Sequence, residues 1–266
     1  MKGKNIAIAV FSGTGNSLEA ARALTAALTE MGRGVALFPM ERSENHIRPD
    51  ADVLGIVTTV ACFSTYPTAW RFIDALPPGK GREAFFLATM GGFGGGMQGP
   101  VRHVLTVKGY RPIGSLVVTM PGNYGNKVLD EAKNKSLKDA AVSRIREYAR
   151  ELEEGTARWS GGVPVVSGFF AALAHGRKPW NMFRRIFPLT VAAEKCTACS
   201  LCVKLCPENN IALEDGLAVL GGRCESCQRC VAFCPSQAIY VPGKPSVQYR
   251  GTSLESIMSL RNSDCS

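Results

Sequence analysis

Two short cysteine runs near the end of the chain constrain its fold more than any other feature. Both have the spacing C-x2-C-x2-C-x3-C-P in a chain of 266 residues. This spacing is typical of loops in which three thiolates hold one cuboidal iron–sulfur cluster and the fourth cysteine reaches a second cluster. The sequence therefore predicts two [4Fe–4S] sites with crossed ligands: Cys196, Cys199, Cys202 and Cys234 for the first, and Cys224, Cys227, Cys230 and Cys206 for the second.

Disulfides and zinc sites are weaker interpretations of the same cysteines. Disulfide frameworks are typical of short secreted chains, whereas this chain can build ordinary cores and has no secretory signal. Zinc sites usually pair two C-x2-C motifs, often with histidine, and do not need the additional x2-C-x3-C-P. Residues 188–241 resemble a bacterial two-[4Fe–4S] ferredoxin, including a repeat of residues 211–213 at residues 238–240.

A polar glycine loop near the N-terminus indicates a second kind of ligand site. It follows an apolar strand-like segment, Asn5–Val10, and precedes a helical stretch at residues 18–31. Backbone N–H groups and the positive end of the helix dipole make such a loop an anion site. The loop is similar to the loop of flavodoxins that holds the FMN phosphate, so the predicted cofactor-binding residues are Ser12, Gly13, Thr14, Gly15, Asn16 and Ser17.

Other phosphate loops fit the sequence poorly. The N-terminal loop lacks the last glycine of the dinucleotide pattern G-x-G-x-x-G and the G-K-[ST] of a P-loop. A later cluster, Gly94–Gly99, matches G-x-G-x-x-G, but residues 109–127 contain no acidic residue that could bind a ribose. We interpret that cluster as a loop beside a flavin.

Strand-like and helix-like segments alternate over the first 155 residues. This alternation predicts an α/β fold, a flavodoxin-like doubly wound five-stranded parallel sheet with helices on both faces. The predicted strands are residues 5–10, 35–38, 53–60, 85–90 and 113–120, and the predicted helices 18–31, 68–76, 97–107 and 127–154. Ligands of such sheets bind at the carboxyl ends of the strands, so we expect the site in the loops at residues 12–17, 60–67, 91–96 and 121–125.

Aromatic residues and glycines in these loops are candidates for contacts with a flavin ring, because a flat apolar ring favours aromatic and backbone partners. The candidates are Phe63, Tyr66, Gly91, Gly92, Phe93 and Gly94. Tyr124 is a weak candidate for a proton donor at the flavin, and Cys62 is interpreted as a small buried residue.

The two ends of the chain together resemble a family of anaerobic flavodoxin–ferredoxin fusion proteins. The resemblance covers residues 4–242 and depends on residues 11–17, 91–93 and 120–124 and on both cysteine runs. It implies FMN and two [4Fe–4S] clusters in one cytoplasmic electron-transport protein, with oxidoreductases as donor and acceptor. FMN stores two electrons and each cluster one, so the hypothesis is conversion between paired and single electrons.

Two further functions remain open. The chain could be a flavin-dependent reductase of an organic substrate, fed by its own clusters, although His46, His103 and His175 lie in no pattern that marks a general acid. The first domain could also be an empty scaffold that docks the second domain to a partner.

The expected domain organisation is a flavodoxin-like FMN-binding domain at residues 1–157, a linker at 158–187, a small α+β ferredoxin-like domain at 188–243 and a C-terminal tail at 244–266. We expect the linker to pack between the domains and the tail to cross a domain surface, with Cys265 outside both clusters. No apolar run reaches the roughly 18 to 20 residues of a transmembrane segment, and the N-terminal run is too short for a signal peptide.

The formal net charge of +9 is weak evidence for nucleic-acid binding. Two clusters and an FMN phosphate, each carrying about −2, would reduce the net charge of the loaded protein to about +3. The chain also shows no zinc finger, basic helix or repeated aromatic–basic pattern. We expect the surplus cations to offset cluster charge or to attract an acidic redox partner.

Overall fold

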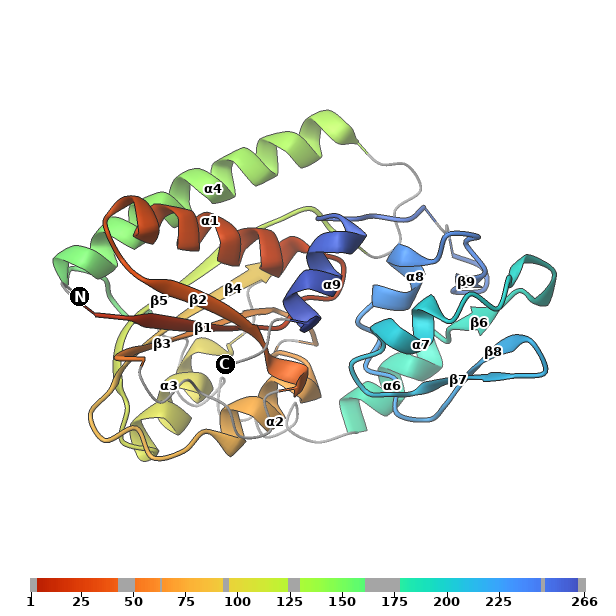
Figure 1. The fold of residues 1–266 in the computed structure, drawn as a ribbon, viewed down its shortest axis with the longest axis horizontal. Coiled ribbons are helices and arrows are strands. Elements are labelled where there is room, and N and C mark those ends of the chain that lie inside the picture. The colour runs from red at the N-terminus through yellow and green to blue at the C-terminus, as the bar shows by residue number, and fades with distance from the viewer. Residues whose placement is uncertain are drawn as a thin grey trace.

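A five-stranded parallel sheet forms the centre of a large lobe, and a smaller lobe lies beyond the carboxyl ends of its strands (Figure 1). This computed structural model describes residues 4–42, 51–62, 64–92, 96–123, 130–160, 178–244 and 247–262. The large lobe comprises the described residues up to 160, and the small lobe comprises residues 188–243.

The strand order in the sheet is β2-β1-β3-β4-β5, and all four pairings are parallel. This is the order of the flavodoxin-like doubly wound fold, so the predicted fold class is confirmed for this lobe. The strands are β1 (Ile6–Val10), β2 (Val35–Pro39), β3 (Val53–Thr59), β4 (Glu83–Met90) and β5 (Arg111–Thr119), and a short 3-10 turn, η1 (Met40–Arg42), follows β2.

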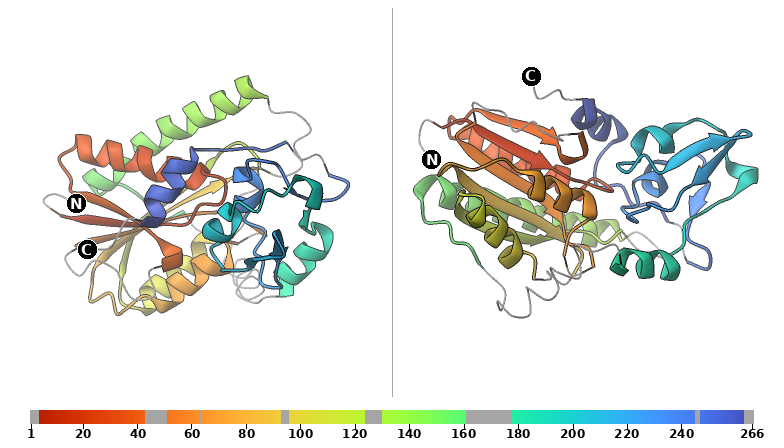
Figure 2. Two further views of the ribbon diagram at one scale, coloured as in Figure 1. Left: turned by 45° about the vertical axis from the view of Figure 1, so that its right-hand side comes forward. Right: turned by 90° about the horizontal axis from the view of Figure 1, so that it is seen from below.

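Helices cover both faces of the sheet (Figures 1 and 2). One face packs against α1 (Asn16–Glu30) and α4 (Glu131–Glu154), and the other against α2 (Pro67–Ala75) and α3 (Gln98–Val107). Successive side chains of a strand point to opposite faces. Ile6 and Ile8 of β1 therefore enter the first core, whereas Ala7 and Ala9 enter the second, which explains why the strand is apolar throughout.

The small lobe repeats one backbone conformation twice. Positive φ angles at Ala198, Ser200 and Asn209 recur 28 positions later, at Ser226, Gln228 and Gln237. The two cysteine runs have the same offset, so both loops adopt one conformation. The elements of this lobe are β6 (Thr190–Val191), η2 (Ala193–Lys195), α7 (Leu201–Leu205), β7 (Ile211–Glu214), β8 (Leu217–Leu220), α8 (Arg229–Phe233) and β9 (Ile239–Tyr240), with β6 paired to β9 and β7 to β8.

Two helices occur where the sequence predicted only a linker and a tail. Helix α6 (Lys178–Ile186) lies at the junction of the lobes, and α9 (Leu254–Asn262) packs beside α1 and β2 of the large lobe (Figures 1 and 2). Ile257 and Leu260 of α9 belong to the same core as Leu205 of α7, so this core extends from one lobe to the other. Across the described ranges, no helix has both the length and the apolarity needed to cross a bilayer.

Candidate functional site

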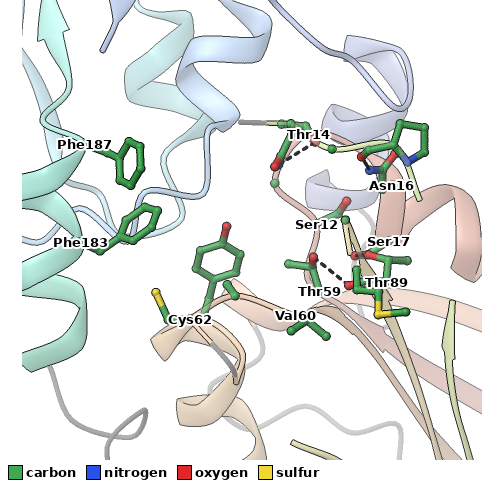
Figure 3. A pocket seen from close by; sticks show the side chains of 18 of the residues that line it. Ser12, Thr14, Asn16, Ser17, Thr59, Val60, Cys62, Thr89, Phe183 and Phe187 are labelled. Atoms are coloured by element: carbon green, nitrogen blue, oxygen red, sulfur yellow. Dashed lines mark hydrogen bonds between the residues drawn. The ribbon is translucent and has the colours of Figure 1, made fainter. Parts of the chain in front are cut away.

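A cavity of about 360 Å³ opens at the carboxyl ends of β1, β3 and β4 (Figure 3). Strand order reverses between β1 and β3, which is the place where open α/β sheets bind ligands. All four loops expected at this edge contribute to the cavity, and helix α6 closes one side of it. The described lining residues are Ser12, Gly13, Thr14, Asn16, Ser17, Thr59, Val60, Ala61, Cys62, Tyr66, Thr89, Met90, Gly91, Pro121, Gly122, Asn123, Trp180, Phe183 and Phe187.

The loop Ser12–Ser17, here called the N-terminal loop, forms a polar and uncharged end of the cavity. The Leu18 backbone N–H donates to Ser12 Oγ over 3.2 Å, and the hydroxyl groups of Ser17 and Thr89 lie 2.9 Å apart. Helix α1 begins at Asn16, so the positive end of its dipole faces this end of the cavity. Hydroxyl groups, backbone N–H groups and a helix N-terminus together suit an anion such as a phosphate.

Amide side chains connect the N-terminal loop to the loop after β5. The Asn16 amide donates to the Pro121 carbonyl over 2.8 Å, and the Asn123 amide donates to Thr14 Oγ1 over 3.3 Å (Figure 3). These hydrogen bonds between the two loops define the shape of the polar end of the cavity.

Aromatic rings form the opposite end of the cavity, where Phe183 and Phe187 lie across from Ser12 and Ser17 (Figure 3). The Tyr66 and Trp180 ring centroids are 5.0 Å apart, and those of Phe183 and Phe187 are 4.7 Å apart. A cavity with one polar end and one aromatic end suits a flat ring that carries a phosphate. The sequence analysis did not predict Trp180 and Phe183 of α6 or Phe187, which follows it, although their spacing places them on one helical face, which is a detectable pattern.

Most of the described residues predicted to bind the cofactor line this cavity. Gly15 and Gly92 are the two described exceptions, since neither lines the cavity. Cys62 lines it, and burial raises the pKa of its thiol to about 11, so the thiol is neutral at neutral pH. The predictions for Phe63, Phe93, Gly94 and Tyr124 fall outside the described residues.

Four cysteines line a second cavity, in the small lobe. They are Cys196, Cys199, Cys202 and Cys234, here called the outer set. Cys199 is exposed, whereas the other three are partly buried. Cys234 comes from the second cysteine run, so cysteines of both runs line this cavity.

The other four cysteines, Cys206, Cys224, Cys227 and Cys230, are here called the inner set. Burial raises the pKa of the Cys224, Cys227 and Cys230 thiols, and the charge of Cys206 raises each of them further. Cys206 of the first run and Cys230 of the second belong to one hydrophobic cluster. Cys206, Cys227 and Cys230 are buried, which distinguishes the inner set from the outer one.

Backbone N–H groups point at sulfur atoms in both runs. Asn210 N–H lies 3.3 Å from Cys206 Sγ, and Ala238 N–H lies 3.3 Å from Cys234 Sγ. Burial alone would raise the pKa of Cys234, but hydrogen bonds from Ser236 and from the following backbone N–H groups lower it. Such donors favour the thiolate form, which is the form that binds iron.

The cysteine sets differ from the site of a single metal ion. Among the described residues, no three His, Cys, Asp or Glu side chains gather closely enough to share one ion. A [4Fe–4S] cluster takes four cysteine thiolates around a group of four irons. The donor set of each cysteine group, four thiols, therefore fits such a cluster.

The N-terminal loop touches the inner cysteine loop, residues 224–230, directly. A Cβ atom added to Gly13 would lie 2.2 Å from the Cys227 carbonyl oxygen, so only glycine allows the two backbones to approach this closely. The cavity and the inner cysteine set are consequently neighbours across one layer of backbone.

The segment 247–262, here called the C-terminal segment, crosses the outer side of the N-terminal loop. Its Gly251 N–H donates to the Thr14 carbonyl over 2.7 Å, and the Tyr249 hydroxyl donates to Asn16 Oδ1 over 2.5 Å. The Gln248 amide donates to the carbonyls of Val231 and Cys234, each over 2.8 Å. This segment therefore links the N-terminal loop to α8 of the small lobe.

Acidic residues of the small lobe also bind helix α2. The Thr68 hydroxyl lies 2.9 Å from carboxylate oxygens of both Glu208 and Glu225, and Arg71 pairs with both carboxylates. Burial and the charge of Glu208 raise the pKa of Glu225 to about 8. The contact joins the lobes on the side of the sheet opposite to α1.

Comparisons with known proteins find similar structures but no similar sequence. No family model matches the sequence, and no curated protein does. A two-electron reduced flavodoxin of Megasphaera elsdenii has 21% identity and a TM-score of 0.37, with 52% of this chain and 98% of that chain covered. An NAD(P)H:quinone oxidoreductase from Methanothermobacter marburgensis has 16% identity and a TM-score of 0.41, with 56% and 94% covered. The rubredoxin oxygen:oxidoreductase of Desulfovibrio gigas has 18% identity and a TM-score of 0.39, with 58% of this chain covered. The match spans only 37% of that protein. The assignment of the fold depends on the strand order described above.

Proposed function

We propose that this chain is an iron–sulfur flavoprotein that transfers electrons between FMN and two [4Fe–4S] clusters. The observation that carries the proposal is the contact between Gly13 of the N-terminal loop and Cys227 of the inner set. A site suited to a phosphate-bearing ring and a buried set of four thiols share a backbone contact there. Proximity of this kind serves electron transfer between two resident groups.

The N-terminal loop would bind the FMN phosphate, and α6 with Tyr66 would contact the flavin ring. Ser12, Thr14 and Ser17 offer hydroxyl donors, and the N-terminus of α1 offers its dipole. The aromatic side chains of Trp180, Phe183 and Phe187 would exclude water from the ring. FMN supplies a two-electron store and each cluster a one-electron store, so their union would interconvert paired and single electrons.

The outer set would hold the first cluster and the inner set the second. Cys199 of the outer set is exposed, and the inner set is buried beside the N-terminal loop. The outer set is therefore the one within reach of an external redox protein, which would act as electron donor or acceptor. Functionally, residues 1–157 would form the flavin domain and residues 188–243 the cluster domain.

Protein purified without oxygen tests the proposal. We expect one FMN and about eight irons per chain, with flavin and iron–sulfur bands in the visible spectrum. Cys206→Ala should lower the iron content while FMN remains bound, because Cys206 belongs to the inner set. Cys62→Ala is the matched control and should retain all the iron. Wild-type protein that lacks FMN, or that holds clearly fewer irons, would contradict the proposal.

A further inference from the structure

Arg229 is a buried cation at the junction of three segments. Only 2% of the residue is exposed. Its Nε and Nη2 donate to the Ser12 carbonyl over 3.2 and 2.6 Å, and its Nη1 donates to the Leu205 carbonyl over 3.1 Å. Ser12 belongs to the N-terminal loop, whereas Arg229 lies between Cys227 and Cys230 in the small lobe. One side chain of the inner cysteine loop thus binds the backbone of the cavity loop.

Among the described residues, Arg229 shares one carboxylate with a second arginine. Glu41, which follows β2, accepts from Arg229 over 2.6 Å and from Arg261 of α9 over 3.0 Å. Burial alone would raise the pKa of Glu41, but the charges of Arg229 and then Arg261 outweigh burial and lower it, so Glu41 is ionised. One carboxylate shared by two guanidinium groups screens each of them only in part, so Arg229 keeps positive charge beside the inner cysteine loop.

Two candidate anion sites, the inner cysteine set and the N-terminal loop, lie on either side of Arg229. Arg229 directly precedes Cys230 and follows Cys227 by two residues, and its Nη1 donates to the carbonyl of Leu205, the residue before Cys206. The chain and this hydrogen bond therefore bring Arg229 to the inner set. On its other side, the Ser12 carbonyl belongs to the loop that would hold the flavin phosphate. The N–H groups of Arg229 donate to backbone carbonyls and to Glu41. Arg229 can therefore influence the N-terminal loop through its hydrogen bonds and the inner cysteine set through its charge.

We propose that Arg229 is a positioning residue that holds the N-terminal loop against the inner cysteine loop and that its charge favours reduction of the inner cluster. The inference deepens the proposed function and depends on it. Arginine suits this role because its planar fork bonds several acceptors at once, which lysine does not reproduce. Charge and hydrogen bonding near a cluster are among the factors that set its potential.

Two substitutions separate the charge of Arg229 from its geometry. In Arg229→Met, we expect the equilibrium constant for reduction of the inner cluster to fall about tenfold, which is ~59 mV toward negative potential for a one-electron couple. The dissociation constant of FMN should also rise about tenfold, because two bonds to Ser12 are lost. In Arg229→Lys, the charge remains, so the equilibrium constant for reduction of the inner cluster should change less than about twofold. The planar fork is lost, so the FMN dissociation constant should rise about tenfold.

Arg261→Met is the matched control, since Arg261 binds the same carboxylate and the same Leu205 carbonyl, whereas the two bonds to Ser12 come from Arg229. Its FMN dissociation constant should stay within about threefold of wild type. The potentials are measured by a redox titration followed by electron paramagnetic resonance, and FMN binding by flavin fluorescence.

Unchanged potential and unchanged FMN binding in Arg229→Met would overturn the inference. If Arg229→Met does not fold, Arg229→Lys decides, because wild-type FMN binding in that variant refutes the positioning role and weakened binding supports it. The FMN and iron contents of the wild-type protein distinguish a failure of the proposed function from a failure of the role given to Arg229. Wild type without these groups refutes the proposed function, whereas fully loaded wild type with unaffected variants refutes only the role of Arg229.

Discussion

At the scale of single residues, the close approach of protein neighbours requires the glycines of the N-terminal loop. Gly13 faces the Cys227 carbonyl, and Gly15, with φ at 114°, would place a Cβ atom 2.5 Å from the Thr252 backbone nitrogen. A flavodoxin-like loop needs glycine for the approach of a phosphate. In this protein, the same glycines also permit the small lobe and the C-terminal segment to pack on the outside of the loop.

Gly13→Ala should force the N-terminal loop away from the inner cysteine loop. The added methyl group would lie 2.2 Å from a backbone oxygen, which cannot move as a flexible side chain does. We expect the free energy of unfolding to fall by about 1–3 kcal/mol, as for other overpacked sites. Gly222→Ala is the control: a Cβ atom there meets nothing within 4 Å, so its effect should stay within about 0.5 kcal/mol. Denaturant unfolding of both variants checks this, and equal effects would contradict the steric argument.

At the scale of secondary-structure elements, α6 joins the cavity to the inner cysteine loop. Its aromatic face lines the cavity, and its Arg184 donates to the Gly222 carbonyl and, over 3.3 Å, to the Cys224 carbonyl. Helix α6 thus presents aromatic rings to the cavity and a guanidinium group to the backbone carbonyls of residues 222 and 224. The segment predicted as a linker therefore contributes a wall to the candidate flavin site.

Phe183→Ala should open that wall. We expect the FMN dissociation constant to rise about tenfold, because ring contacts of this kind are worth about 1.4 kcal/mol. Met182 is the neighbouring residue on the same helix and is 62% exposed, so Met182→Ala should leave FMN binding unchanged. Flavin fluorescence measures both. Equal FMN binding by Phe183→Ala and wild type would show that α6 does not contact the flavin.

At the scale of the whole molecule, the two lobes share their interior. One hydrophobic core contains Leu24 of α1, Phe233 of α8 and Leu260 of α9. The Arg229–Glu41–Arg261 cluster joins α8 and α9 to η1, the turn after β2. Shared cores and a buried ion cluster oppose independent motion of the lobes. Such a junction would keep the cavity and the inner cysteine set at one separation, as the proposed function requires.

Glu41→Gln should weaken the junction of the lobes. The substitution leaves two buried arginines without their carboxylate, for which we expect a loss of about 3–5 kcal/mol at neutral pH. The pKa of Glu41 is lowered from 4.5 in the folded protein, so its contribution is complete above pH 4.5 and is lost as the pH falls through the lowered value. The difference in free energy of unfolding between wild type and variant should therefore shrink below pH 4.5. A difference that does not depend on pH would contradict an ionised Glu41.

Local patterns in the amino-acid sequence are sufficient to predict the parallel sheet and the two cysteine runs. Apolar strand segments with helical stretches between them specify the parallel sheet, because each segment carries its own periodicity. The spacing of each cysteine run is likewise local, and it already separates Cys206 and Cys234 from the three cysteines that precede each of them. These features could be predicted from short stretches of chain.

The contacts between distant segments are not encoded in any local pattern and are known from the folded chain. Nothing near Arg229 in the sequence points to Ser12, and nothing near Trp180 points to Tyr66, yet both pairs are in contact. Such contacts depend on how the lobes pack, which is a property of the whole hydrophobic interior and not of any local motif. The helical structure of residues 254–262 has the same origin, because its buried face is stabilised by a core that the large and small lobes build together.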